Sequence, residues 1–227
     1  MSVGPALRSE GEPPKVLIAA KAPVPGNVKT RLSPPLSPEL AARLAGAFLA
    51  DVLAAARAVD PGAGILCPPA DAAALRERFP GTPTVEQAGA GLTETLATNL
   101  ATGAVVVAGD APAIRPDTIA AAVASTAELV LAPSHDGGFG LIRLRGDAAA
   151  LFAGIAWSTG SVLDQTVAAG RALGLRAELL ESVPDVDTAA DLAGLDLSRA
   201  AATRAVLDAA RWDPAHVPGA PGVRLRP

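Results

Sequence analysis

Residues 16–32, VLIAAKAPVPGNVKTRL, give the clearest indication of the fold. The first five of them are continuously apolar, which is typical of a strand buried on both faces of a parallel sheet. A loop rich in proline and glycine follows at once and carries Lys21, Lys29 and Arg31. Because open α/β sheets bind ligands beyond the carboxyl ends of their strands, we expect this loop to lie at a binding site.

The rest of the chain alternates apolar runs with helical patterns. Ser37 and Pro38 predict the start of an amphipathic helix that reaches about Val59. Further strands are predicted at Gly64–Cys67, near Val85, at Ala104–Gly109, at Leu129–Ala132 and near Arg176–Leu180. Further helices are predicted at Asp71–Arg78, from Leu92, from Pro116, at Thr159–Leu173 and within Thr188–Ala210. This alternation indicates βαβ units and a mostly parallel sheet, with residues 139–145 as an antiparallel neighbour.

Composition narrows the class of protein. The chain has 227 residues, with 19 basic and 23 acidic side chains and no dense basic stripe, so nucleic acid is not expected as a partner. Its one cysteine, Cys67, excludes an internal disulfide and fits a reducing compartment, so we expect a cytoplasmic protein. No apolar stretch reaches the roughly 18–20 residues of a membrane span, and the N-terminus does not resemble a signal peptide.

These patterns predict the domain boundaries. We expect residues 1–14 to be a flexible N-terminus and residues 15–210 to be one domain. Residues 211–227 are rich in proline and glycine and are predicted to form an irregular tail. The sequence does not determine the oligomeric state, and a homodimer is one of the alternatives.

The first loop concentrates the lysines of the chain. Lys15, Lys21 and Lys29 are its only three lysines, and two of them flank the loop that Pro25 and Gly26 shape. With Arg31 they suit the neutralisation of a polyphosphate. A solvated basic loop is the alternative, since neither a dinucleotide-binding nor a P-loop glycine pattern is present.

Acidic residues follow two later strands. Asp110 comes directly after the apolar run AVVVAG, where a carboxylate can bind Mg²⁺ together with phosphate oxygens. Asp187, in the run PDVDTAADL that also holds Asp185 and Asp191, could face Asp110 and share that cation. The alternatives are helix caps: Asp110 for the next helix, Asp187 as an N-cap and Asp191 as a first-turn acid.

Two glycine-containing loops are weaker candidates. Asp136, Gly137 and Gly138 form a turn whose backbone could approach a ligand, although a plain tight turn fits equally. In the loop from residue 87 to residue 91, Gln87 could contact a base edge, and Gly91 could let the backbone pass a ribose.

No pattern for a nucleophilic hydrolase or a zinc site is present. There is no Gly-x-Ser-x-Gly, and His135 and His216 have no partner at metal-ligand spacing.

Five motifs occur in the order of one bacterial family. They are KAPVPGNVKTRL, GDAPAI, LAPSHDGGFGLI, LFAGIAWSTGSVL and DVDTAADL, and they span about Val16 to Leu192. The chain thereby resembles the glycosyltransferase A-like family, also called radical-SAM/selenodomain-associated transferase 1. It is more distantly similar to 2-phospholactate guanylyltransferases and molybdenum-cofactor nucleotidyltransferases. It departs from the family at Ala111, where relatives often have cysteine, and at Phe139–Gly140.

The resemblance implies a three-layer α/β/α sandwich of the nucleotide-diphospho-sugar transferase (GT-A, Rossmann-like) type. It places phosphates at Lys29 and Arg31, a Mg²⁺ or Mn²⁺ ion at Asp110 and Asp187, and the acceptor beside Asp136, Gly137 and Gly138. The residues predicted to be catalytic are Lys29, Arg31, Asp110 and Asp136. The predicted nucleotide-binding and acceptor-binding residues are Lys21, Pro25, Gly26, Lys29, Arg31, Gln87, Gly91, Gly137 and Gly138.

Two transfer reactions fit these residues. The loop cations favour nucleotidyl transfer from a nucleoside triphosphate to a small phosphorylated or phosphonate acceptor, with release of pyrophosphate. The alternative is glycosyl transfer from a nucleotide sugar, with Asp136 as the base. A nucleotide-binding regulator without turnover would not need Asp110 and Asp187.

Overall fold

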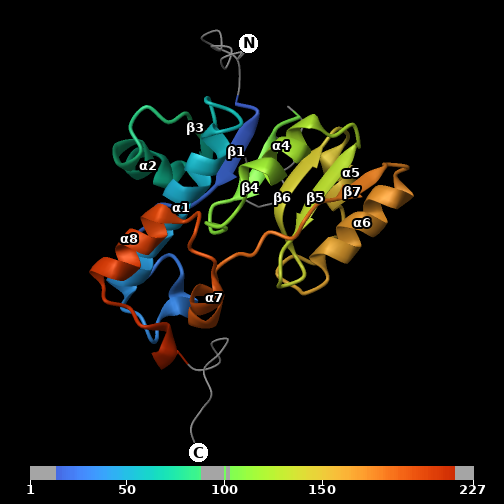
Figure 1. Cartoon of the computed structure of the whole chain (residues 1–227). Coiled ribbons are helices and arrows are strands. Elements are labelled where there is room, and N and C mark those ends of the chain that lie inside the picture. Colours follow the sequence, from blue (N-terminus) through green and yellow to red (C-terminus); the bar gives the residue numbers. More distant parts are fainter. Residues whose placement is uncertain (1–13, 88–99, 101–102, 218–227) are drawn as a thin grey trace, which may run out of the picture.

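The computed structural model describes residues 14–87, 100 and 103–217, and its centre is a seven-stranded sheet flanked by helices (Figure 1). The strands are β1 (Val16–Ala19), β2 (Gly64–Cys67), β3 (Thr84–Glu86), β4 (Val105–Ala108), β5 (Leu129–Pro133), β6 (Phe139–Leu144) and β7 (Ala177–Leu179). The helices are α1 (Pro38–Arg57), α2 (Ala72–Arg78), α4 (Pro116–Ala124), α5 (Ala148–Phe152), α6 (Val162–Ala172), α7 (Ala189–Gly194) and α8 (Ala201–Ala209). Short 3-10 turns are η1 (Thr30–Leu32), η2 (Pro69–Asp71) and η3 (Pro214–His216).

The strand order is β3-β2-β1-β4-β6-β5-β7. All neighbours pair in parallel except β6, which is antiparallel to both β4 and β5. The predicted α/β class, the mostly parallel sheet and the antiparallel run at 139–145 are therefore confirmed. Because β1 and β4 are parallel neighbours in the middle of the sheet, the loops that follow them leave from the same edge.

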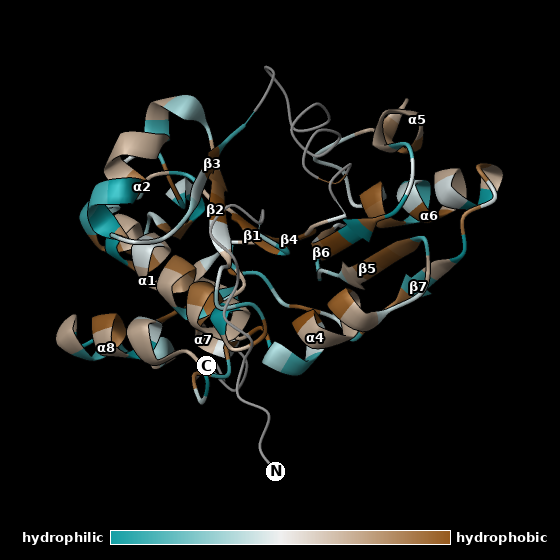
Figure 2. Cartoon of the chain, turned by 90° about the horizontal axis from the view of Figure 1, so that it is seen from above, coloured by the Kyte–Doolittle hydropathy of each residue, from teal (hydrophilic) through white to brown (hydrophobic). Residues whose placement is uncertain are grey.

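Both faces of the sheet are covered, as the continuous apolar strands predict. Alternate residues of β1 point to opposite sides: Val16 and Ile18 pack with apolar residues of α1, α2 and α4, whereas Leu17 packs with those of α5 and α6. Figure 2 shows α1 and α4 on one side of the hydrophobic strands and α5 and α6 on the other. Among the described residues, no helix is both long and apolar enough to cross a membrane.

A third apolar cluster joins the first loop to the C-terminal part of the chain. Its buried members are Leu32, Leu36, Ala41, Leu44, Phe48, Val186, Leu192 and Leu207. The buried carboxylate of Asp51 on α1 reinforces this contact, since it accepts hydrogen bonds from the backbone N–H groups of Ala202 and Thr203, at 2.8 and 2.9 Å, and from the Thr203 hydroxyl. Asp51 thus caps α8 from another helix and fixes it on α1.

The structure differs from the sequence-based expectation in two places, at α5 and in the C-terminal tail. The short helix α5 was not predicted, and Asp147 caps it by accepting bonds from Ala149 N and Ala150 N. The helical segments predicted from Thr188 to Ala210 are present as α7 and α8. The tail expected to be irregular contains η3, whose start Asp213 caps, and Val217 after it is buried. The helix expected from Leu92 lies outside the described residues.

Candidate active site at the sheet edge

Residues from three distant parts of the chain meet beyond the carboxyl ends of β1 and β4. Lys29 and Arg31 come from the loop after β1, and Asp110 lies just past the end of β4. Asp187 comes from the segment between β7 and α7. That segment is tied to β4 because Val186 N donates a 3.0 Å hydrogen bond to the carbonyl oxygen of Asp110.

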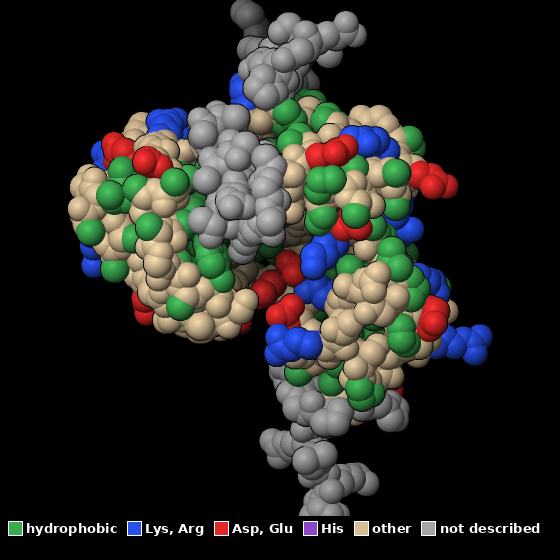
Figure 3. Space-filling model, turned by 180° about the vertical axis from the view of Figure 1, so that it is seen from behind, with side chains coloured by type: hydrophobic (Ala, Val, Ile, Leu, Met, Phe, Trp, Pro, Cys, Tyr) green, Lys and Arg blue, Asp and Glu red, His purple; other side chains and the backbone are tan. Residues whose placement is uncertain are grey.

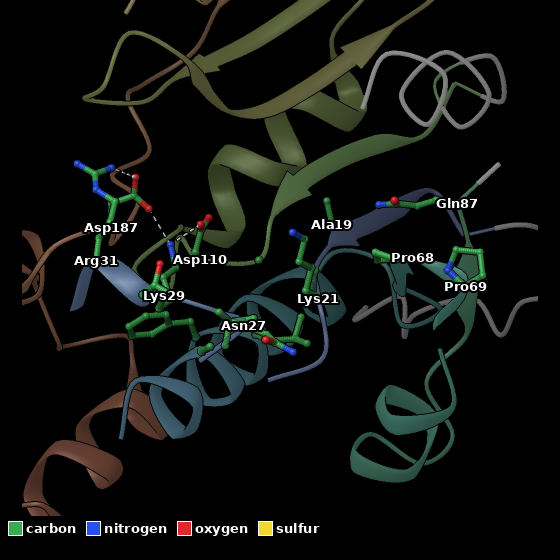
Figure 4. A pocket seen from close by; sticks show the side chains of 17 residues that line it. Ala19, Lys21, Asn27, Lys29, Arg31, Pro68, Pro69, Gln87, Asp110 and Asp187 are labelled. Carbon is green, nitrogen blue, oxygen red and sulfur yellow. Dashed lines mark hydrogen bonds and ion pairs between the residues drawn. The ribbon is translucent and has the colours of Figure 1, made fainter. Parts of the chain in front are cut away.

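The charged groups form a continuous chain of ion pairs (Figure 4). Lys29 Nζ donates to Asp110 Oδ2 at 2.6 Å and to Asp187 Oδ1 at 2.9 Å. Arg31 donates from Nη1 to the other oxygen of Asp187, Oδ2, at 3.0 Å. The structure therefore brings together four of the residues that the sequence singled out.

Apolar anchors explain why these charges meet. Leu32 and Val186 are fully buried in the same cluster, and each is a chain neighbour of a charged residue, Arg31 and Asp187. Burying the two apolar side chains together therefore places the adjacent charged ones together. Lys29 adopts the left-handed conformation, with φ of 47° and ψ of 39°, which is rare for a residue other than glycine and tends to occur at functional sites.

The ammonium of Lys29 is charged in this setting. Burial lowers its pKa and is the largest single influence, but the attraction and hydrogen bonds of Asp110 and Asp187 together outweigh it. The net pKa of Lys29 is therefore raised above its ordinary value, and the side chain is a permanent cation at neutral pH.

A cavity of about 810 Å³ opens beside this cluster. Lys29, Arg31, Asp110 and Asp187 line one end of it, and Pro68, Pro69 and Gln87, which follow β2 and β3, line the other, with Lys21 between them (Figure 4). Such a size suits a nucleotide or a similar small molecule.

Two loop residues of the predicted site lie elsewhere. Pro25 and Gly26 form an exposed turn, and they are not among the described residues that line the cavity. Their part is to reverse the chain, with φ of 79° at Gly26, so that Lys21 and Lys29 lie along the same cavity. Gly91 lies outside the described residues.

A second cavity, of about 570 Å³, adjoins the first, since Arg31 and Asp187 line both. His135 and Asp136 from the β5–β6 turn and Asp185 from the segment before α7 also line it. The two cavities thus meet at one ion pair. Figure 3 shows acidic and basic side chains side by side at a hollow between two lobes of the molecule.

The turn that carries Asp136 is rigidly built. Ser134 Oγ and Gly138 N donate to Asp136 Oδ1 at 2.5 and 3.0 Å, and these bonds, with the bond from Ser134 the largest influence, lower the pKa of Asp136. Gly137 has φ of 85°, and a side chain there would collide with the backbone of Gly160. The two glycines therefore shape the turn rather than line either cavity among the described residues.

The sequence did not single out Asp185 as a ligand, but the structure places it in an acidic triad. Within the described part of the chain, Asp136, Asp185 and Asp187 each offer one carboxylate oxygen, and the three oxygens lie within 4.8 Å of one another. Burial, and then repulsion from Asp110, Asp136 and Asp187, raise the pKa of Asp185 to about 6. Such a set of hard oxygen donors can bind Mg²⁺ or Mn²⁺.

Asp191 has the structural role that the sequence left open. It forms a capping box with Thr188 at the start of α7, where its Oδ2 accepts from Thr188 N at 2.7 Å. It also accepts a bond from Asp187 N at 3.2 Å, and so it holds the backbone of the site segment.

Comparison with known proteins identifies a family. A family model described as "Uncharacterized protein conserved in bacteria (DUF2064)" matches residues 38–159, more than half of the chain. The chain belongs to this family. A comparison with curated proteins gives no match.

One of the similar solved structures supports the fold. The chain is similar to a candidate nucleotide-diphospho-sugar transferase from Desulfovibrio desulfuricans G20, with 28% identity, a TM-score of 0.74, and coverage of 86% of this chain and 94% of the other. It also matches a nucleotidyl transferase from Methanothermobacter thermautotroptrophicus, with 15% identity, a TM-score of 0.48, and coverage of 78% and 93%. The second likeness is too distant to bear on function. The first shows that this DUF2064 protein shares the fold of the Desulfovibrio protein.

Proposed function

We propose that this DUF2064 protein is a nucleotidyltransferase that requires Mg²⁺ or Mn²⁺. It would transfer a nucleoside monophosphate from a nucleoside triphosphate to a small acceptor and release pyrophosphate. The observation that carries the proposal is the cluster of Lys29, Arg31, Asp110 and Asp187 at the end of the larger cavity. Two cations and two carboxylates around one point suit a metal-bound polyphosphate.

In this proposal the larger cavity holds the nucleotide. Its base lies at the end formed by Pro68 and Pro69, whose rings offer an apolar wall, and Gln87 hydrogen-bonds the base edge. The triphosphate extends toward Lys29 and Arg31, with Lys21 beside it. Lysine and arginine neutralise the phosphate oxygens, so less charge remains to repel an attacking nucleophile.

The carboxylates are proposed as the ligands of the divalent cation. Asp110 and Asp187 already share one cation, the Lys29 ammonium, so their oxygens lie within reach of a single small ion. Asp136 and Asp185 extend the donor set on the side of the second cavity. When bound there, the ion would neutralise charge that develops on the phosphates during transfer.

The second cavity is proposed for the acceptor, because it meets the first at Arg31 and Asp187. An acceptor oxygen forms a bond to the α-phosphorus while the bond from that phosphorus to the bridging oxygen breaks. The leaving pyrophosphate takes the electron pair and is held by Lys29 and Arg31. The sequence favours a phosphorylated or phosphonate acceptor. Because carboxylates line the second cavity and would repel such an anion, Arg31 and the divalent cation would be needed to hold it there.

Glycosyl transfer from a nucleotide sugar is the second candidate, and the name of the Desulfovibrio protein favours it. In that case the same cluster would hold the diphosphate of the donor as the leaving group. Asp136, which lines the second cavity, would face the acceptor hydroxyl.

Thermal shift with a ligand panel separates the two candidates. The protein is incubated with Mg²⁺ and each common nucleoside triphosphate or nucleotide sugar, and the melting temperature is measured. Stabilisation by a triphosphate, and not by nucleotide sugars, supports nucleotidyl transfer, and the reverse supports glycosyl transfer. Lys29→Ala should abolish either response. A flat response across the panel would contradict both.

A further inference from the structure

The ammonium of Lys29 occupies the point that Asp110 and Asp187 share. Its side chain is only 12% exposed, whereas the carboxylates of Asp110 and Asp187 are 35% and 33% exposed. Arg31, which is 70% exposed, takes the remaining oxygen of Asp187. In the free protein, the carboxylates proposed as metal ligands are thus already neutralised by the chain's own cations.

A divalent cation must compete with this arrangement. Binding at Asp110 and Asp187 requires the oxygens to which the Lys29 ammonium now donates, and two positive charges cannot share that point. A cation held instead by Asp136, Asp185 and Asp187 also uses Asp187, both of whose oxygens have a cationic partner. On either arrangement, Lys29 has to move or lose a charge-assisted hydrogen bond.

A triphosphate can supply the replacement partners. Lys29 lines the larger cavity as well as contacting the two carboxylates, and a lysine has a flexible four-carbon stem. Rotation of that stem would carry the ammonium from carboxylate oxygens to phosphate oxygens. Once the ammonium has moved, the oxygens of both aspartates are open to the divalent cation.

We infer that Lys29 makes the binding of the divalent cation and of the triphosphate depend on each other, because its ammonium closes the cation site until phosphate oxygens draw it away. This inference rests on the proposed function, and it adds an order of events: the cation enters with the polyphosphate rather than before it. By linkage, each ligand must raise the affinity for the other by the same factor.

The test measures Mn²⁺ affinity from the electron paramagnetic resonance signal of the free ion. Inorganic tripolyphosphate is the probe, because it contains no base, and its own complex with Mn²⁺ is subtracted. In wild type, tripolyphosphate should raise Mn²⁺ affinity by about ten- to a hundredfold. In Lys29→Met, Mn²⁺ alone should bind about tenfold more tightly than in wild type, and the effect of tripolyphosphate should fall to about threefold or less.

Two matched variants isolate the cause. Lys29→Arg keeps the charge, so its Mn²⁺ affinity without tripolyphosphate should stay close to that of wild type. Arg176→Met removes an equal charge from an exposed side chain that pairs with Glu128 and lines neither cavity, so Mn²⁺ affinity should change by less than about twofold. If Lys29→Met does not fold, Lys29→Gln replaces it.

Equal Mn²⁺ affinity in wild type and Lys29→Met would overturn the inference, and so would a wild-type Mn²⁺ affinity that tripolyphosphate leaves unchanged. If nucleoside triphosphates still stabilise the wild-type protein in either case, the inference fails and the proposed function stands. If no triphosphate binds at all, the proposed function fails and the inference fails with it.

Discussion

Lys29 and Asp187 are 158 positions apart in the chain, yet the ammonium of one lies 2.9 Å from a carboxylate oxygen of the other. The contact depends on the central sheet, in which β1 and β4 end at one edge, and on the apolar cluster that buries both Leu32 and Val186. Charges alone would not bring such a pair together, since the cost of removing two partly buried charges from water offsets much of their attraction. Packing of the fold therefore brings Lys29 and Asp187 together, and their charges determine which ligands they can bind.

Asp110→Asn should remove cation-dependent nucleotidyl transfer while preserving the fold. The amide keeps the shape of the carboxylate but loses its charge, and a catalytic cation is worth several kcal/mol, so the rate should fall by about a hundredfold or more. Lys29 keeps Asp187 as a partner, so the free energy of unfolding should change by less than about 2 kcal/mol. Full turnover of Asp110→Asn in Mg²⁺, measured as pyrophosphate release, would show that Asp110 is not a cation ligand.

Arg31→Ala should separate ligand binding from stability. The Arg31 side chain is 70% exposed, so its loss should change the free energy of unfolding by less than about 1 kcal/mol. Tripolyphosphate affinity, measured by calorimetry, should fall roughly ten- to a hundredfold. Arg176→Ala, which removes an exposed ion pair with Glu128, is the control and should leave that affinity unchanged. An equal effect of both variants would mean that only overall charge matters.

Leu32→Ala should weaken the site through packing. Leu32 is fully buried beside Arg31, so its truncation should lower the free energy of unfolding by about 2–5 kcal/mol. Tripolyphosphate affinity should also fall, because Arg31 and Asp187 lose their shared anchor. Leu179→Ala, at a 53% exposed position, should change stability by about 0.5 kcal/mol or less. Urea unfolding measures the stability of both variants, and calorimetry measures their tripolyphosphate affinity. A Leu32→Ala variant with wild-type stability and affinity would refute the anchoring role.

Asp51→Ala should detach the C-terminal helices. Its buried carboxylate accepts three hydrogen bonds at the start of α8, so its loss should lower the free energy of unfolding by about 2–4 kcal/mol. The matched control is Asp117→Ala, which removes an exposed acid paired with Arg115. This loss should change the free energy of unfolding by about 0.5 kcal/mol or less. Hydrogen exchange should show faster amide exchange in α8 of Asp51→Ala. If the amides of α8 exchange at the same rate in Asp51→Ala as in wild type, Asp51 does not hold α8 on α1.

Asp185→Asn should stabilise the cation-free protein. Burial and neighbouring carboxylates raise the pKa of Asp185 to about 6 from an ordinary 3.8, so its ionised form opposes folding. The cost is fully present above about pH 6 and is lost as pH falls toward 3.8, where both folded and unfolded chains carry the neutral acid. The melting temperature of the variant should therefore exceed that of wild type at pH 7, by a margin that shrinks on acidification. A variant that melts lower than wild type at pH 7 would contradict this.

Sequence reasoning reached most of the fold because the strands are continuous apolar runs bounded by proline and glycine. It located β2 at Gly64–Cys67 and the cap at Ser37, since both depend on local chemistry. It missed α5, because five residues are too few to show a helical period. It predicted the role of Asp191 in part, as a first-turn acid, and the structure shows that Asp191 forms a capping box with Thr188.

The site was predictable as a set of residues but not as an arrangement. A parallel sheet explains why Asp110, just past the end of β4, lies at the same edge as the loop after β1 that carries Lys29. The sheet does not explain why Lys29 lies between the two aspartates, because that depends on the burial of Val186 and the left-handed backbone at Lys29. Asp185 was passed over because its approach to Asp136 joins two loops far apart in sequence.

The most direct test of the account is a crystal structure of the protein with Mn²⁺ and the α,β-methylene analogue of whichever triphosphate stabilises it best. The account predicts an anomalous manganese peak bonded to Asp187 and Asp110, with the ammonium of Lys29 and the guanidinium of Arg31 on phosphate oxygens. A triphosphate bound elsewhere, or Lys29 still bonded to both aspartates beside a bound nucleotide, would contradict it.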